Sequence, residues 1–148
     1  MIKTVLFLLL FKLGAAMATP EILCDFSIKS ASANEAVLLT FSVHNQTSQI
    51  QSVLTWQTPL EGFWSEMFII KDENNQDVIY QGPLAKRGQP AKADYLNLAP
   101  QEKTMMSLVL SDAYALKKGR YQLTIAPNNL HLAQLCQAYT FPITFRVK

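Results

Sequence analysis

The fold is decided by the stretch Val37-Leu38-Leu39-Thr40-Phe41-Ser42-Val43-His44. Every second side chain in it is apolar and large enough to fill a core, namely Val37, Leu39, Phe41 and Val43. A period of two residues is typical of a β-strand that buries one face. The polar residues Asn45-Gln46-Thr47-Ser48 follow and favour a turn. The stretch therefore predicts a half-buried strand that ends near Asn45.

The same period recurs on both sides of this strand. Further strands are predicted at 24–28, 53–57, 67–71, 78–80, 106–110, 121–125 and 139–147. Short strands separated by turns are typical of two packed antiparallel sheets. A helical pattern is confined to 129–136, where it covers a turn or two. We therefore predict an all-β fold, an antiparallel β-sandwich with at most short helical turns.

Two local features indicate an immunoglobulin-like sandwich. The segment Leu110-Ser111-Asp112-Ala113-Tyr114 leads into a strand that contains Tyr121, as at the crossing between the E and F strands. Tyr121 is then predicted to be the tyrosine-corner residue, and Trp56 the central indole of the core. Leu123 stands where the second cysteine of the usual B–F bridge would lie, so that bridge is not expected.

Length and composition restrict the class of protein. The chain has 148 residues, of which 49% are hydrophobic and 16% charged, and this excludes a disordered tail. A chain of this length is expected to form one domain with a real core. Its 13 basic and 11 acidic residues become 11 and 11 once Lys3 and Lys12 are removed with a leader. Nucleic-acid binding needs a concentrated basic face, so no nucleic-acid partner is predicted.

The leader is predicted to be a signal peptide that covers residues 1–18. Lys3 supplies the positive charge, 4–11 is an apolar run, and Ala16-Met17-Ala18 is a small-x-small cleavage site. Cleavage after Ala18 would leave 19–148 as a single domain, secreted or periplasmic and without membrane attachment.

Two other interpretations of the leader fit the sequence less well. A membrane anchor would need about 20 apolar residues, whereas this run is shorter and Lys12 interrupts it. A lipoprotein signal could end at Cys24, but Ile22-Leu23 before it lacks the small residues that such processing requires.

The two cysteines, Cys24 and Cys136, lie near the two ends of the predicted domain. In an exported protein an even pair is most simply one disulfide. Closing so long a loop is worth about 4–5 kcal/mol in chain-entropy models. A redox or metal site is the alternative, but neither CxxC spacing nor a neighbouring histidine supports it.

Few residues offer chemistry. His44 and His131 are the two histidines, and they form no HExxH or HxH motif, so both are expected to be surface residues and no metal or cofactor is predicted. No GxSxG motif or phosphate-binding glycine loop is present. Glu61 and Glu66 could act as an acid–base pair, although loop carboxylates are usually only solvated. Asn45-Gln46-Thr47 matches a glycosylation sequon, which matters only in a eukaryotic source. The chain is therefore predicted not to be an enzyme.

One loop is unusual. Gly82-Pro83 and Gly88-Gln89-Pro90 bracket Lys86 and Arg87 on a conformationally restricted backbone. It is either an ordinary connection whose cations face water or a surface that contacts a partner. The partner-binding residues of the second hypothesis are Pro83, Lys86, Arg87, Phe63 and Trp64.

Several blocks of sequence together suggest a family. They are 56–62, 68–70, 80–83, 86–88, 94–95, 98–100 and 110–114. Within roughly 27–125, the chain resembles the amino-terminal propeptide domain of bacterial deuterolysin-type zinc metallopeptidases, the aspzincins. Gln101, where the family often has glycine, and the pair Cys24 and Cys136 depart from its pattern. No HExxH catalytic domain is present in this sequence.

The resemblance implies an immunoglobulin-like fold and a role in proteolysis without catalysis. Aspzincins include enzymes that favour lysine on the primed side of the cut, which implies an acidic pocket that Lys86 or Arg87 could occupy. The expected function is therefore to bind a separate secreted zinc metallopeptidase in trans, as inhibitor or folding chaperone, with the free protein a monomer. The alternative is a secreted or periplasmic immunoglobulin-like module that binds a protein or glycan through its loop aromatics.

Overall fold

The structure is a computed structural model that describes residues 21–29, 32 and 35–148. The predicted signal peptide, 1–18, lies outside the described residues. The strands are β1 (Ile22–Ile28), β2 (Leu38–Asn45), β3 (Gln51–Leu54), β4 (Phe68–Asp72), β5 (Asp77–Val78), β6 (Tyr95–Leu98), β7 (Lys103–Val109), β8 (Gly119–Ile125) and β9 (Ile143–Val147). The helical elements are η1 (Pro59–Glu61), η2 (Lys92–Asp94), η3 (Leu110–Asp112) and α1 (Leu130–Leu135).

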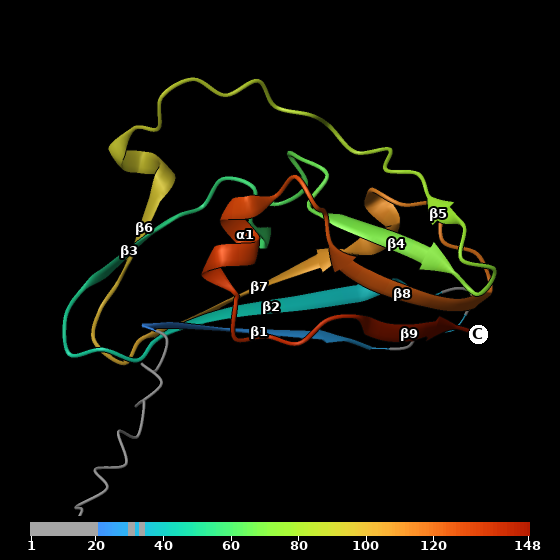
Figure 1. Ribbon diagram of the computed structural model, residues 1–148, viewed down its shortest axis with the longest axis horizontal. Helices are drawn as coiled ribbons and strands as arrows, with labels where there is room; N and C mark the ends of the chain where they lie inside the picture. The colour runs from blue at the N-terminus through green and yellow to red at the C-terminus, as the bar shows by residue number, and fades with distance from the viewer. Residues whose placement is uncertain (1–20, 30–31, 33–34) are drawn as a thin grey trace, which may run out of the picture.

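The strands form an all-β, sandwich-like fold, as the period of two predicts. One sheet has the order β1-β2-β7 and the other the order β5-β4-β8-β9, and all their pairings are antiparallel. Figure 1 shows the two sheets as layers, with a two-stranded ribbon of β3 and β6 extending away from them. The only α-helix in the described part of the chain, α1, confirms the predicted short helical segment at 129–136.

The core lies between the two sheets. Leu39, Phe41 and Val43 of β2 are completely buried, which confirms the alternation that predicted this strand. The Phe26 ring of β1 packs 4.8 Å from Phe41 and, edge to face across the sandwich, 6.1 Å from Phe68 of β4. Each strand thus contributes its apolar face to one continuous cluster, whose burial is the main favourable term in folding.

The ribbon continues the β2–β7 pair beyond a corner. At this corner Asn45 donates its main-chain N–H to the carbonyl of Glu102 over 2.9 Å. Its completely buried side chain donates to the carbonyls of Gln49, Leu98 and Ala99 over 2.7, 3.0 and 2.9 Å. The Asn45 carboxamide therefore joins the turn after β2 to the turn before β7.

Two predicted cross-links are present. The Tyr121 hydroxyl accepts from the N–H of Lys117 at 2.9 Å and donates to its carbonyl at 2.8 Å, the arrangement of a tyrosine corner. Cys24 of β1 forms a disulfide with Cys136 at the end of α1, with their Cα atoms 5.2 Å apart. The bridge therefore fastens the end of α1 to the first strand.

The prediction that Trp56 is the central core indole is wrong. The third strand ends at Leu54 instead of continuing to Gln57, because Gln57 adopts a left-handed φ of 58° and Thr58 turns back to the carbonyl of Thr55. Trp56 is only half-buried and lies outside the hydrophobic core. The last strand is also shorter than predicted, since it begins at Ile143 after Pro142, whose nitrogen carries no hydrogen to donate.

Candidate functional site

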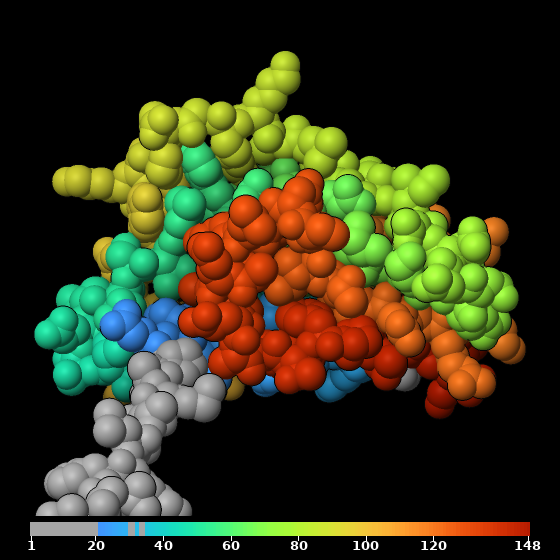
Figure 2. All heavy atoms as spheres, in the orientation of Figure 1, coloured from blue at the N-terminus to red at the C-terminus, as the bar shows by residue number. Residues whose placement is uncertain are grey.

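The loop that contains Lys86 and Arg87 runs across the surface of the molecule in an extended conformation. Residues 81–91 of this loop are called the strap. It leads from β5 to η2 and forms the upper surface in Figures 1 and 2, over the segment that joins β3 to β4. Its first residue, Gln81, donates its N–H to the carbonyl of Ala113 over 2.8 Å. Its last, Ala91, donates its N–H to a side-chain oxygen of Asp94 over 2.7 Å. Both ends are therefore fastened.

Tyr80 shapes the first turn of the strap. Its hydroxyl donates to the carbonyl of Pro83 over 2.9 Å, so its ring folds over Gly82. A Cβ atom at Gly82 would overlap the Tyr80 hydroxyl and ring, which explains why glycine occupies this position. The strap thus begins with a turn in which the position of the Tyr80 ring requires glycine at residue 82.

The middle of the strap is anchored by Arg87. Its guanidinium donates to Glu61 Oε2 over 2.6 Å, and its Cζ lies 4.9 Å from the centroid of the Trp56 ring. The Glu61 side chain is only 10% exposed and its other oxygen accepts the N–H of Gln57 over 2.7 Å. A charge-assisted bond in such a partly buried position is stronger than an exposed ion pair. Arg87 therefore holds the strap against η1 and the Trp56 turn.

The tethers leave Lys86 as the outward cation of the strap. Ala85 donates its N–H to the carbonyl of Trp64 over 2.8 Å, and Arg87 is bound to Glu61, so the residues on both sides of Lys86 are fixed inward. Lys86 itself is exposed. Leu84 of the strap is 72% exposed, and Trp64, whose carbonyl accepts the bond from Ala85, is 51% exposed. Two large apolar side chains therefore lie on the surface here.

A shallow hollow opens beside these tethers. It measures about 370 Å³, and its lining residues are Thr55, Trp56, Glu61, Trp64, Ala85, Arg87 and Asp94. Two indoles and two carboxylates line it together with one guanidinium. The arrangement has the aromatic and polar groups of a binding surface, but no nucleophile paired with a base.

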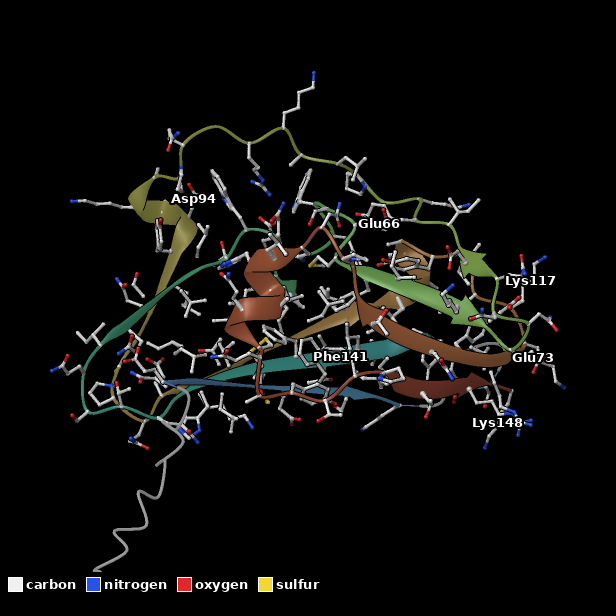
Figure 3. All side chains as sticks on the ribbon, in the orientation of Figure 1. Glu66, Glu73, Asp94, Lys117, Phe141 and Lys148 are labelled. Carbon is white, nitrogen blue, oxygen red and sulfur yellow. A yellow bond between two sulfur atoms is a disulfide. The ribbon has the colours of Figure 1, made fainter. Side chains whose placement is uncertain are left out.

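The remaining predicted site residues lie next to the strap. Pro83 is exposed, whereas Phe63 is half-buried and packs its ring 6.2 Å from that of Tyr114. Burial raises the pKa of both Tyr80 and Tyr114, and the negative charge of Glu66, which Figure 3 labels below the strap, raises each pKa further. Both phenols therefore stay protonated as donors, Tyr80 to the Pro83 carbonyl of the strap and Tyr114 to the Phe68 carbonyl of β4.

His44, His131 and Glu66 do not line the hollow, and His44 is half-buried on β2. His131 is half-buried and bonds through Nε2 to the Leu54 carbonyl over 2.9 Å, so it is not the solvated surface residue that was predicted. A carbonyl acceptor requires the hydrogen to be on Nε2. Glu66 is exposed. Among the described residues, no three His, Cys, Asp or Glu side chains come together in a way that could hold a metal ion.

Sequence reasoning found the strap but missed three of its features. The Arg87–Glu61 pair joins residues that lie 26 positions apart, and no local pattern links them. Trp56, which the sequence predicts in the core, lines the hollow. Leu84 was overlooked, although an exposed leucine between Pro83 and Ala85 in a glycine- and proline-rich loop is a signal that sequence alone could have provided.

Comparisons with known proteins give little further guidance. No protein-family model matches the chain, and no curated protein matches it. Among solved structures, the chain is similar to the yjhA protein from Bacillus subtilis, with a TM-score of 0.38 and 12% sequence identity over 89% of this chain and 95% of that chain. No helix in the described residues is long and apolar enough to cross a membrane. Function must therefore be inferred from the residues of the chain itself.

Proposed function

We propose that this protein is an exported, non-catalytic domain that binds a secreted zinc metallopeptidase in trans through the strap, as inhibitor or folding chaperone. The observation that carries the proposal is the exposed Lys86 between two inward tethers, the Ala85–Trp64 hydrogen bond and the Arg87–Glu61 ion pair. The resemblance of 27–125 to aspzincin propeptides supports the choice of partner.

A tethered strap suits this task physically. Binding a flexible loop costs conformational entropy, and a loop already held in an extended conformation loses less. Lys86 would enter an acidic pocket of the peptidase, while Leu84 and Trp64 would bury apolar area beside it. Arg87 would hold the strap in its bound conformation and would not enter the pocket, since its guanidinium is paired with Glu61.

The disulfide between two buried cysteines supports an oxidising location, because such bonds persist mainly outside the cytosol. The proposed sequence of events is export with the leader 1–18, cleavage after Ala18, and folding of 19–148 as a monomer. No nucleic acid or membrane takes part in the proposed interaction.

The test uses the protein as bait for the exported fraction of its own source. Bound material is assayed for peptidase activity that a metal chelator abolishes, and the recovered enzyme is then titrated with wild type, Lys86→Ala and the matched control Lys92→Ala. Lys92 is an exposed lysine of η2 outside the strap. We expect Lys86→Ala to weaken binding by about 30-fold or more, as for a residue at the centre of an interface, and Lys92→Ala to leave it unchanged.

Arg87→Gln provides the second arm of the test. It should weaken binding mainly through faster dissociation, because it loosens the strap while leaving Lys86 in place. Equal affinity of wild type and Lys86→Ala would contradict the proposed contact, and recovery of no chelator-sensitive peptidase would contradict the proposed partner.

A second candidate function is a protein- or glycan-binding module without a role in proteolysis. The observation that favours it is the hollow in which Trp56 and Trp64 lie beside the carboxylates of Glu61 and Asp94. Tryptophan offers an apolar face with a polar edge, which suits such ligands. In this case Trp64→Ala, added to the panel, would abolish capture of the partner and Lys86→Ala would not, so the effect of Lys86→Ala separates the two functions.

A further inference from the structure

A second hollow lies on the outer face of the four-stranded sheet β5-β4-β8-β9, away from the strap. It measures about 900 Å³ and lies between the turn after β4 and the exposed side of β8 and β9. Its lining residues are 72–75 from the β4–β5 hairpin, 120–122 from β8 and 144–146 from β9. Nothing in the proposed peptidase interaction uses this surface.

Two arginines face each other in this hollow. Arg120 of β8 is directly opposite Arg146 of β9 in the antiparallel register, and both are exposed. Residues opposite each other in such a pair have Cβ atoms about 4.5–5.5 Å apart, so both guanidinium groups can reach a single small ligand. Like charges directly opposite each other disfavour the folded sheet. An anion bound between them would remove that repulsion.

Two of the three carboxylates near this pair have partners within the β4–β5 hairpin. Asp77 pairs with Lys71 over 2.9 Å, and Asp72 Oδ1 accepts the N–H groups of Asn74 and Gln76, each over 2.9 Å. In the described part of the chain, neither Arg120 nor Arg146 forms an ion pair. Asp72 and Glu73 both line the hollow, and their negative charges oppose an anion there.

Three lysines near the hollow add positive charge to that of the two arginines, against the carboxylates of Asp72 and Glu73. Lys117 and Lys118 precede β8, and Lys148 follows β9; all three are exposed, and no acidic residue lies in 117–120 or 146–148. Figure 3 labels Lys117, Glu73 and Lys148 at the same end of the molecule. Lys148 also attracts Glu35, whose pKa is lowered first by the Ser32 N–H that its carboxylate accepts over 3.0 Å and to a lesser degree by this lysine.

We infer that the Arg120–Arg146 pair is a binding site for a phosphate-bearing ligand. Guanidinium groups match the geometry of phosphate oxygens in two parallel hydrogen bonds, and two opposed arginines offer four such donors. Gln122 and Thr144, which are opposite each other one step further along the same face, would accept or donate hydrogen bonds to the rest of the ligand. The same chemistry would suit a phosphate in solution or a phosphate in a lipid headgroup.

The test measures binding of two probes at low ionic strength: inorganic pyrophosphate in solution, and vesicles of phosphatidylglycerol with phosphatidylcholine vesicles as reference. We expect saturable binding that weakens as salt is added, because exposed charges are screened. Arg120→Gln/Arg146→Gln should weaken it by about tenfold or more, the loss of charge-assisted hydrogen bonds. Glu73→Gln should strengthen it.

The matched control is Lys92→Gln/Lys103→Gln, which removes the same charge from exposed positions outside the hollow. It should bind as wild type does. Pyrophosphate should also raise the thermal midpoint of wild type but not that of the double arginine variant. Binding to pyrophosphate would assign the site to soluble phosphates, and binding to phosphatidylglycerol alone would assign it to a lipid surface. No saturable binding to either probe, or equal weakening in the lysine control, would overturn the inference.

Discussion

Asn45 shows at the scale of one residue how a sequence motif and its structure can have different meanings. Its side chain heads a glycosylation sequon, yet it is completely buried. Its amide nitrogen donates hydrogen bonds to three main-chain carbonyls, and its oxygen accepts the N–H and hydroxyl of Thr47 over 2.9 and 2.8 Å. An enzyme cannot reach this nitrogen in the folded protein. The Asn45 side chain therefore stabilises the corner between the sheet and the ribbon, through hydrogen bonds to both turns.

We predict that Asn45→Ala lowers the free energy of unfolding by about 3 kcal/mol, because it leaves several buried polar groups without a partner. Urea denaturation would measure this. Asn97→Ala is the matched control, since Asn97 is an exposed asparagine of β6 and its loss should change stability by about 0.5 kcal/mol or less. Similar effects of the two substitutions would show that the corner does not depend on the Asn45 carboxamide.

The phenol of Tyr114 makes the free energy of unfolding depend on pH in the alkaline range. Its hydroxyl donates to the Phe68 carbonyl over 2.8 Å, and burial raises its pKa well above the ordinary value of 10.0. The folded protein thus keeps a proton that an unfolded tyrosine loses near pH 10, so stability is fully present below about pH 10 and falls as the pH rises further.

We predict that Tyr114→Phe costs about 1–2 kcal/mol at neutral pH, through the lost hydrogen bond. Above about pH 10 the difference between variant and wild type should shrink, because the variant has no phenol to ionise at this position. Unfolding free energies measured between neutral and strongly alkaline pH test this, with the exposed Tyr95→Phe as control. A constant difference across the range would contradict it.

At the scale of elements, the sequence predicts what depends on local periodicity. The alternation at Leu39, Phe41 and Val43 is sufficient for β2 because one face of the strand is buried along its whole length. The four-residue strand β6 was not predicted, since Tyr95-Leu96-Asn97-Leu98 is too short for a pattern to stand out. It forms because β3 pairs with it across the ribbon.

The candidate site was harder to predict for the same reason. Turn residues locate the strap, because glycine and proline act on their own backbone. The direction of Arg87 depends instead on Glu61 and Trp56, which η1 and the left-handed Gln57 place beneath it. Which of two adjacent cations faces solvent is thus decided by tertiary contacts, and sequence alone treated Lys86 and Arg87 as equivalent.

At the scale of the whole molecule, one chain of contacts joins the disulfide to the strap. Cys136 ends α1, and the helix bonds to the segment 54–57 through His131 to the Leu54 carbonyl and through Asn129 to the Gln57 carbonyl, over 2.9 and 2.8 Å. This segment carries Trp56, on which the Arg87 guanidinium rests. The bridge thus restrains the helix that supports the floor of the hollow.

We predict that Cys24→Ala/Cys136→Ala destabilises the protein by about 4–5 kcal/mol, because the bridge joins residues 112 positions apart and restricts the unfolded chain accordingly. Urea denaturation of wild type with and without reductant, beside the double variant, measures this. Both cysteines are buried, so reductant should act on the wild type only as it unfolds. In the folded variant, hydrogen exchange should quicken first at Leu132 and Cys136, whose N–H groups bond to Asn129 Oδ1 and to the Leu132 carbonyl, and only slightly in β2. Equal protection of the helix in both proteins would mean that α1 is held by its side-chain contacts alone and that the bridge acts only on the unfolded state.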